Sequence, residues 1–143
     1  MLKSCIIGYG NIAVSHKKGY DKLLDVSVVA ACDIRPERRE LAISHGLRAY
    51  ESVEEMLEKE SPDFVDICLP TYLHADFAVK AMEKGINVIC EKPFTTTVEK
   101  SAEILVKMLS MRPDKLQTIT TKNFRDLAVD FKVTLPEKFL YEK

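Results

Sequence analysis

Short apolar runs alternate with segments that carry helix start and stop signals, and this alternation constrains the fold more than any other feature of the sequence. The apolar runs are rich in β-branched residues and cover residues 2–7, 26–32, 64–69 and 86–90, with weaker runs at 48–50 and 116–120. Such runs are typical of strands that are buried on both faces of a parallel sheet. Strands that alternate with helices predict an α/β fold with a doubly wound, mostly parallel sheet of strand order 3-2-1-4-5-6.

The segments between the apolar runs carry residues that begin and end helices. We expect one helix from Pro36 to near Gly46, because proline suits the first turn and glycine the end of a helix. A second helix is expected from Thr71 to near Gly85. Two capping boxes are also predicted, Ser52 with Glu55 and Thr96 with Glu99.

Charge and length narrow the classes of function. The 143 residues suit one domain, and 21 Lys and Arg face 22 Asp and Glu, which gives no electrostatic reason to propose a nucleic acid or an anionic membrane as partner. No apolar run approaches the roughly 20 residues that span a bilayer, and the first ten residues do not resemble a signal peptide. A cytoplasmic protein is therefore expected.

The four cysteines do not have the spacing of a metal site. None of them forms a CxxC pair, and each lies inside or at the end of an apolar run: Cys5, Cys32, Cys68 and Cys90. We interpret them as small, reduced core residues and predict no metal site.

A glycine pattern follows the first apolar run. Gly8-Tyr9-Gly10-Asn11-Ile12-Ala13 has the form G-x-G-x-x-A, in which Gly8 allows a tight turn, Gly10 lets a pyrophosphate approach the backbone, and Ala13 lets the next helix pack closely. The helix that begins near Asn11 and Ile12 offers free N–H groups to phosphates. The alternative is a glycine turn without a ligand, but the place of the pattern between a strand and a helix favours a Rossmann dinucleotide-binding domain.

An acidic residue follows the second run. Asp33 lies 23 positions after Gly10, where a carboxylate can accept hydrogen bonds from both adenosine ribose hydroxyls and repel a 2′-phosphate. This favours NAD over NADP as cofactor. The alternative role of Asp33 is the N-cap of the helix at Pro36. Three arginines nearby could stack on adenine or accept a 2′-phosphate: Arg35, Arg38 and Arg39.

A more specific pattern lies at Glu91-Lys92-Pro93. Together with the glycine turn, it makes the sequence resemble the glucose–fructose oxidoreductase, inositol dehydrogenase and rhizopine-catabolism family (Gfo/Idh/MocA) over about residues 2–120. The matching stretches are Gly8 to Ile12 with His16, then Asp33, then residues 63–71 (DFVDICLPT) with His74, and residues 85–93 (GINVICEKP).

The resemblance implies an NAD(P)-dependent dehydrogenase that acts on a sugar, a polyol or a related hydroxyl compound. It implies that Lys92 lies near the reacting carbon, where it orients the substrate hydroxyl or moves its proton. It also assigns two groups to the cofactor: Leu69, Pro70, Thr71 and His74 near the nicotinamide, and Glu91, Lys92 and Pro93 at the end of the fifth strand. His74 could instead cap or pack in its helix, and His16 and His45 are interpreted as surface or packing residues.

The sequence departs from the family in length. Family members carry a second domain with most substrate contacts, whereas this sequence ends at Lys143, so we expect residues 1–121 to form the Rossmann domain and little or no activity from this chain alone. A short dehydrogenase completed by another chain and a non-catalytic nucleotide-binding or regulatory module are the alternatives. Residues 122–143 are a tail in which 127–135 alternate apolar and polar, which favours a strand over a helix and suggests that it packs back or forms a homodimer.

Overall fold

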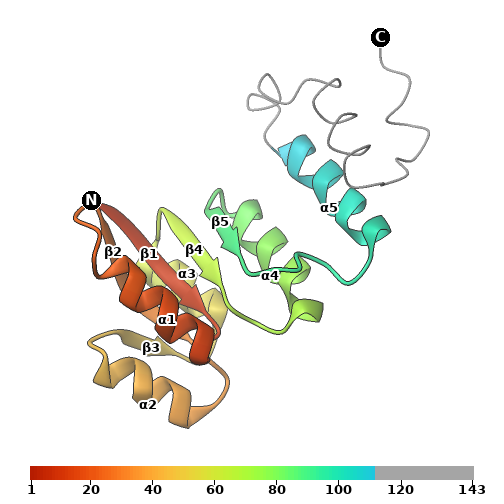
Figure 1. The fold of residues 1–143 in the computed structure, drawn as a ribbon. Coiled ribbons are helices and arrows are strands. Elements are labelled where there is room, and N and C mark those ends of the chain that lie inside the picture. The colour runs from red at the N-terminus through yellow and green to blue at the C-terminus, as the bar shows by residue number, and fades with distance from the viewer. Residues whose placement is uncertain (112–143) are drawn as a thin grey trace. The chain divides into compact units, whose positions relative to one another are not determined.

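Residues 1–95 form a five-stranded sheet in which every neighbouring pair of strands is parallel (Figure 1). The structure is a computed structural model that describes residues 1–111, and the chain divides into two units, Met1–Thr95 and Thr96–Lys143. The strands are β1 (Leu2–Ile7), β2 (Val26–Cys32), β3 (Arg48–Tyr50), β4 (Phe64–Ile67) and β5 (Asn87–Cys90). The helices of this unit are α1 (Asn11–Tyr20), α2 (Pro36–Ser44), α3 (Val53–Glu60) and α4 (Thr71–Glu83), and α5 (Val98–Met111) belongs to the second unit.

The strand order is β3-β2-β1-β4-β5, so the predicted doubly wound fold is confirmed for five strands. The predicted strand at 116–120 and the predicted tail strand at 127–135 lie outside the described residues. From β1 the chain adds β2 and β3 on one side, and it then crosses back to add β4 and β5 on the other side of β1. The strand order therefore changes direction between β1 and β4, and ligands of such sheets bind beyond the carboxyl ends of the strands at this point.

Two apolar clusters cover the two faces of the sheet. Successive residues of a strand point to opposite faces, and Cys5 and Ile7 of β1 belong to one cluster whereas Ile6 belongs to the other. The first cluster contains side chains of α3 and α4, and the second contains side chains of α1 and α2. Figure 1 accordingly shows α1 and α3 on opposite sides of the sheet.

The register of the sheet brings four strand ends to one edge. Ile7 of β1 pairs with Cys32 of β2 and Ile67 of β4, and Ile67 pairs with Cys90 of β5. The residues that directly follow these strands therefore lie along the same edge: Gly8, Asp33, Cys68 and Glu91.

One of the two predicted capping boxes is shifted. Ser52 caps α3 as expected, because its Oγ accepts a hydrogen bond from the Glu55 N–H at 3.2 Å. The predicted cap at Thr96 is wrong, because α5 begins at Val98 and the Lys100 N–H donates to Oγ1 of Thr97 at 3.2 Å. The cap is the residue just before the first helical one, and Thr97 lacks the capping-box signal of Thr96 because Lys100, not a glutamate, follows three residues later.

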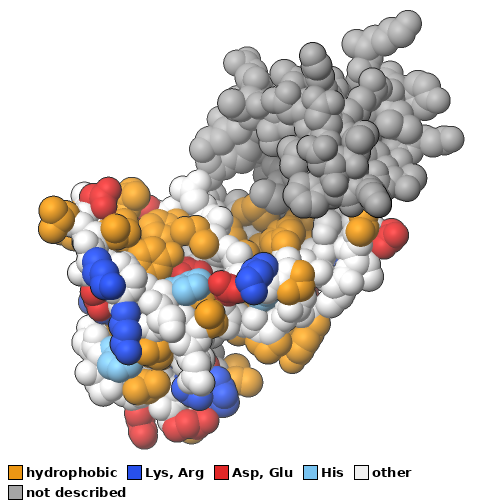
Figure 2. Space-filling model, in the orientation of Figure 1, with side chains coloured by type: hydrophobic (Ala, Val, Ile, Leu, Met, Phe, Trp, Pro, Cys, Tyr) orange, Lys and Arg blue, Asp and Glu red, His pale blue; other side chains and the backbone are white. Residues whose placement is uncertain are grey.

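The described part of the chain has mixed surface charge and free thiols. On the face drawn in Figure 2, acidic and basic side chains are interspersed. None of the helices in residues 1–111 is long and apolar enough to cross a membrane. Cys5, Cys32 and Cys68 are buried free thiols, as predicted, and Cys90 is a partly buried one. Burial raises the pKa of Cys5 and Cys32 to about 12, which keeps both thiols protonated in the core.

Candidate nucleotide-binding site

The two glycines after β1 have different surroundings. Gly8 has a φ of +86°, and a Cβ there would lie 2.8 Å from Cδ2 of Leu69 and 2.9 Å from the carbonyl oxygen of Cys68, so only glycine fits. Its N–H donates to the carbonyl oxygen of Cys32 at 2.7 Å. A Cβ on Gly10 would meet no atom within 4 Å, so the backbone at Gly10 faces open space. This is the arrangement that a pyrophosphate requires.

Tyr9 fixes the turn between the glycines. Its ring is fully buried, and its hydroxyl is hydrogen-bonded to Nδ1 of His45 at 2.9 Å. The N–H of Tyr9 donates to Oδ2 of Asp33 at 2.9 Å. The turn is therefore tied to the end of β2 through both Gly8 and Tyr9. His45 is exposed and packs edge-on against the Tyr9 ring, in line with its interpretation as a surface or packing residue.

The first turn of α1 follows at Asn11 and Ile12, which are both exposed. The first N–H groups of a helix have no partner within it, and α1 has no acidic residue in its first turn. Nη1 of Arg38 donates to Oδ1 of Asn11 at 3.3 Å, which brings a cation to this end. The helix end therefore suits an anionic group such as a pyrophosphate.

Asp33 is nearly buried, and its carboxylate is paired. Oδ1 accepts from the N–H of Arg35 at 3.0 Å and from its Nε at 3.1 Å, and Oδ2 accepts from Nη2 of Arg35 at 3.1 Å. Burial raises the pKa of Asp33, but the hydrogen bonds from Arg35 and Tyr9 outweigh it and leave the pKa below its ordinary value. The N-cap of α2 is Arg35, so the alternative role of Asp33 as that cap is wrong. The exposed Arg35 side chain occupies the oxygens that a ribose would use.

A cleft of about 420 Å³ lies beyond the carboxyl ends of β1, β2 and β4. Among the predicted site residues, those that line it are Gly8, Gly10, Asp33, Arg35, Leu69 and Pro70. Ile34, Val53, Tyr72, Leu73 and Phe77 add apolar surface to its lining. The structure thus brings together the ribose, pyrophosphate and strand-four parts of the predicted site, and these residues fit a dinucleotide. The remaining predicted residues lie outside this lining: Asn11, Ile12, Thr71, His74, Glu91, Lys92 and Pro93.

His74 connects the segment after β4 with the segment after β5. Its side chain is 1% exposed, with Nε2 at 2.6 Å from the carbonyl oxygen of Leu69 and Nδ1 at 2.9 Å from that of Pro93. Thr71, the first residue of α4, is half-buried. Because both ring nitrogens of His74 contact main-chain carbonyls, this residue holds the two segments together from within.

Lys92 and Pro93 are exposed, and the peptide bond between them is cis. No ion pair among residues 1–111 involves the Lys92 ammonium group. The N–H of Lys92 donates to Oε2 of Glu91 at 3.3 Å, and the N–H of Glu91 donates to the carbonyl oxygen of Ile67 at 3.0 Å. The main chain of this segment is held to the sheet while the lysine side chain reaches solvent.

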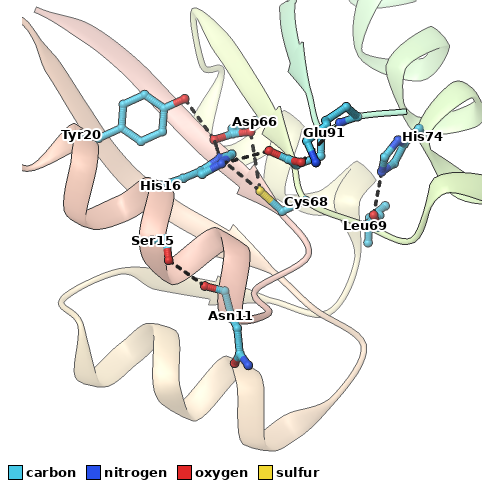
Figure 3. A network of polar contacts seen from close by, with 10 residues as sticks. Asn11, Ser15, His16, Tyr20, Asp66, Cys68, Leu69, His74 and Glu91 are labelled. Atoms are coloured by element: carbon cyan, nitrogen blue, oxygen red, sulfur yellow. Dashed lines mark hydrogen bonds and ion pairs between the residues drawn. The ribbon is translucent and has the colours of Figure 1, made fainter. Parts of the chain in front are cut away.

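A polar network beside Glu91 was not predicted (Figure 3). Nδ1 of His16 lies 2.8 Å from Oδ2 of Asp66, and its Nε2 lies 3.2 Å from Oε1 of Glu91. The hydroxyl of Tyr20 donates to Oδ2 of Asp66 at 3.0 Å. Asp66 is fully buried, and the sequence does carry a signal for it, since it is a charged residue inside a run of apolar residues. His16 is therefore a partner of two carboxylates and not only a surface or packing residue.

The same cluster contains three kinds of metal ligand, whose atoms lie within 4.8 Å of one another: His16, Asp66 and Cys68. Two ligands on one tetrahedral zinc ion are about 3.3 Å apart, whereas Nδ1 of His16 and Oδ2 of Asp66 are at a hydrogen-bonding distance of 2.8 Å. The Cys68 thiol is 3.6 Å from Oδ1 of Asp66, to which it donates. Burial and the carboxylate of Asp66 raise the pKa of Cys68 well above its ordinary value, so a metal must displace a firmly held proton. Hydrogen bonds account for this arrangement.

Comparison with known proteins identifies relatives of this domain. Residues 2–118 match the Gfo/Idh/MocA family, described as an oxidoreductase family with an NAD-binding Rossmann fold. D-glucoside 3-dehydrogenase of Escherichia coli (strain K12) is 34% identical over 106 residues, which are 72% of this chain and 30% of that protein. D-xylose 1-dehydrogenase (NADP(+)) 2 of Haloferax volcanii is 34% identical over 115 residues, which are 78% of this chain and 29% of that protein.

A solved structure supports the same assignment. An oxidoreductase from Agrobacterium radiobacter, in complex with NAD⁺, L-tartaric acid and magnesium, has a TM-score of 0.73 at 25% identity, covering 77% of this chain and 33% of its own. The chain thus spans about a third of the length of the proteins that it matches. On the match over residues 2–118, this chain belongs to the Gfo/Idh/MocA oxidoreductase family and contains its NAD-binding Rossmann domain.

Proposed function

We propose that this domain binds NAD in preference to NADP and serves an oxidoreductase that acts on the hydroxyl group of a sugar, a polyol or a related compound. The bound nicotinamide supplies the site that accepts the hydride. The relatives named for D-glucoside and D-xylose support this substrate class. The chain's own residues hold the ribose, the pyrophosphate and the substrate hydroxyl.

The position and charge of Asp33 carry the proposal for NAD. Its carboxylate lines the cleft beside the glycine turn, and its lowered pKa keeps it ionised at neutral pH. A ribose diol can replace the two side-chain hydrogen bonds of Arg35, whose side chain is 49% exposed and free to move into solvent. A 2′-phosphate would instead meet a buried negative charge, although Arg35 offsets part of this repulsion.

Lys92 is the proposed group for proton transfer. It follows β5 at the same sheet edge as the glycine turn, and its ammonium group is exposed. A cation at this place can orient a substrate hydroxyl and stabilise the alkoxide that forms as the hydroxyl loses its proton, and this alkoxide becomes a carbonyl as the hydride leaves. We also propose a cytoplasmic location, which the free thiols of all four cysteines support.

Calorimetric titration of the purified chain with NADH and NADPH tests the choice of nucleotide. We expect NADH to bind roughly tenfold to a hundredfold more tightly, because NADPH loses a carboxylate–diol contact and adds repulsion worth about 1–3 kcal/mol. Equal or tighter binding of NADPH would contradict the preference and point to Arg35 or Arg38 as a phosphate-binding residue. No binding of either nucleotide would contradict the proposed function itself.

Substitution of Lys92 tests its role toward substrate. Lys92→Ala should change NADH affinity by less than about threefold, because the cofactor is held at the glycine turn and Asp33. With a panel of sugars and polyols, turnover by these 143 residues should stay near background, since orienting a second reactant needs groups besides Lys92. Robust NADH formation that Lys92→Ala abolishes would show that the domain is a competent enzyme, whereas NADH binding with no turnover in any assembly would favour a nucleotide-binding module.

A further inference from the structure

Both neighbours of Lys92 are held by histidines. Glu91 on its N-terminal side lies with Oε1 at 3.2 Å from Nε2 of His16, and Pro93 on the other side has its carbonyl oxygen at 2.9 Å from Nδ1 of His74. His16 belongs to α1 and His74 to α4. The segment after β5 is therefore anchored to two helices, one on each side of the exposed lysine.

The Glu91 side chain transmits the first anchor to Lys92. One carboxylate oxygen faces His16, and the other accepts the main-chain N–H of Lys92 at 3.3 Å. The N–H of Glu91 is bonded to the carbonyl oxygen of Ile67 in β4. With its backbone on the sheet and its carboxylate between His16 and Lys92, Glu91 sets the direction in which the main chain leaves β5.

Asp66 fixes the ring of His16. Its Oδ2 lies 2.8 Å from Nδ1, and Asp66 is fully buried on β4, where the Tyr20 hydroxyl also binds it (Figure 3). A carboxylate on one ring nitrogen orients an imidazole and fixes where the other nitrogen points. The ring of His16 therefore presents Nε2 to Glu91 in one direction.

We propose that His16 is a positioning residue for Lys92, which it holds through Glu91 while Asp66 holds His16. This proposal deepens the proposed function and rests on it for the role of Lys92. Because α1 also begins at the glycine turn, one helix holds both the proposed pyrophosphate site and, through His16, the proposed substrate-facing lysine. The position of the bound cofactor and the position of Lys92 would then both depend on α1.

Two amide substitutions of His16 separate its two contacts. The Asn side chain places its amide nitrogen near the position of Nδ1 and keeps the bond to Asp66, whereas Gln places it near Nε2 and keeps the bond to Glu91. Hydrogen exchange of the Lys92 amide, followed by NMR on the full chain without nucleotide, is the readout. We expect exchange roughly three- to tenfold faster in His16→Asn and close to wild type in His16→Gln.

Thermal unfolding of the same variants should show the opposite order. His16→Gln removes the shortest contact of the buried Asp66, which keeps only Tyr20 and Cys68 as donors, and should lower the melting temperature more than His16→Asn does. Glu91→Gln keeps the shape of the side chain and one acceptor oxygen for the Lys92 N–H, and should retain more Lys92 protection than Glu91→Ala. A structural role alone would make Lys92 exchange follow stability in every variant.

Two results would overturn the proposal: unchanged Lys92 exchange in His16→Asn, or equal acceleration in both His16 variants. NADH titration of the wild-type chain is measured separately. If wild type binds no NADH but the exchange pattern holds, the proposed function fails while the positioning of Lys92 stands. If NADH binds and the exchange pattern fails, the positioning role of His16 fails while the proposed nucleotide binding stands.

Discussion

The two glycines of the turn make opposite demands on a side chain. Gly10 faces open space at a φ of −81°, so Gly10→Val should leave the melting temperature within a few degrees of wild type. The valine would occupy the space of the pyrophosphate, and NADH affinity should fall roughly a hundredfold or more. Calorimetry measures the binding, and circular dichroism checks the fold. Normal NADH binding in this variant would show that the phosphates lie elsewhere.

Gly8→Ala serves as the matched control, because it adds less volume at the neighbouring glycine. Its Cβ would lie 2.8 Å from Leu69 and 2.9 Å from Cys68 at a φ of +86°. We expect a loss of about 1–3 kcal/mol in the free energy of unfolding, measured with urea. A Gly8→Ala protein as stable as wild type would contradict the described geometry of the turn.

Arg35 should moderate the discrimination between the nucleotides. In Arg35→Ala, the Asp33 carboxylate loses its guanidinium partner and its charge is less offset, so NADPH binding should weaken by about tenfold. NADH should bind at least as tightly as to wild type, because its ribose no longer displaces the arginine. Tighter NADPH binding in this variant would contradict the assignment. Arg38→Ala is the comparison, because Arg38 contacts Asn11 at the proposed pyrophosphate site and not Asp33, so its loss should weaken NADH and NADPH binding to a similar extent.

Some site residues could be predicted from the sequence and others could not. Gly8, Gly10 and Asp33 were predicted because their roles depend on local spacing next to a strand, and the structure places them along one cleft. The contact of His16 with Asp66 joins residues 50 positions apart and depends on how α1 lies across β4, which no local pattern records. His74 was predicted near the nicotinamide, but its side chain is buried and outside the cleft lining, and its two carbonyl partners depend on the path of two loops.

At the scale of elements, a buried carboxylate joins α3 to β3. Glu60 is 4% exposed and accepts hydrogen bonds from Arg48 at 2.6 and 2.5 Å and from the Tyr50 hydroxyl at 2.6 Å. The hydrogen bonds from Arg48 lower the pKa of Glu60 from its ordinary value of 4.5 to about 2. This pairing stabilises the folded state fully above pH 4.5, and the stabilisation is lost as the pH falls toward 2.

Glu60→Gln should therefore lower stability in a pH-dependent way. We expect a loss of about 2 kcal/mol in the free energy of unfolding at pH 7, and a much smaller difference from wild type at about pH 2.5. Urea unfolding at the two pH values measures both. Glu55→Gln is the control on the same helix, because its ion pair with Lys59 is exposed and should contribute less than about 1 kcal/mol. A Glu60 effect that is independent of pH would contradict the lowered pKa.

The elements were predictable to different degrees. The bounds of β1, β2 and β3 match the predicted runs. Burial on both faces leaves a continuous apolar pattern in β1 and β2, whereas β3 is a short edge strand with no buried residue. β4 is shorter than its run, because Cys68 and Leu69 lie beyond Ile67 in the cleft lining, and β5 begins one residue later than its run, after the buried Ile86. Cys68 and Leu69 are apolar because they line the cleft, and the sequence pattern of a strand does not distinguish cleft residues from core residues.

At the scale of the whole molecule, the order of five strands agrees with the doubly wound arrangement that we expected from the alternation of strands and helices. Parallel neighbours need crossover helices, and this constraint leaves few topologies. The sequence also predicted that Gly8, Asp33 and Glu91 lie at one edge of the sheet, because the carboxyl ends of parallel strands share an edge. The distances between these residues could not be predicted, because they depend on side-chain packing.

The sequence also predicts an association through residues 127–135, which lie outside the described part of the chain. Five alternating apolar residues, each worth about 1.5–3 kcal/mol when buried, are enough to hold this segment to the domain or to a second copy. Light scattering on the full chain and on a chain ending at Thr121 distinguishes the two outcomes, since a dimer that becomes monomeric on truncation would support the interface, whereas an ordered tail in a monomer would pack back on the domain. A monomeric full chain whose tail amides exchange at random-coil rates would contradict the predicted strand.

The hydrogen bond from the Tyr9 N–H to Asp33 limits how the nucleotide preference can be redesigned. Removing the acid to admit a 2′-phosphate also removes the acceptor that holds the middle of the glycine turn. Asparagine is the substitution that separates the two effects, since its carbonyl oxygen still accepts from Tyr9 but carries no charge. Alanine or glycine would relax the preference and loosen the turn together, so a gain in NADPH binding from either is offset by weaker binding of every dinucleotide.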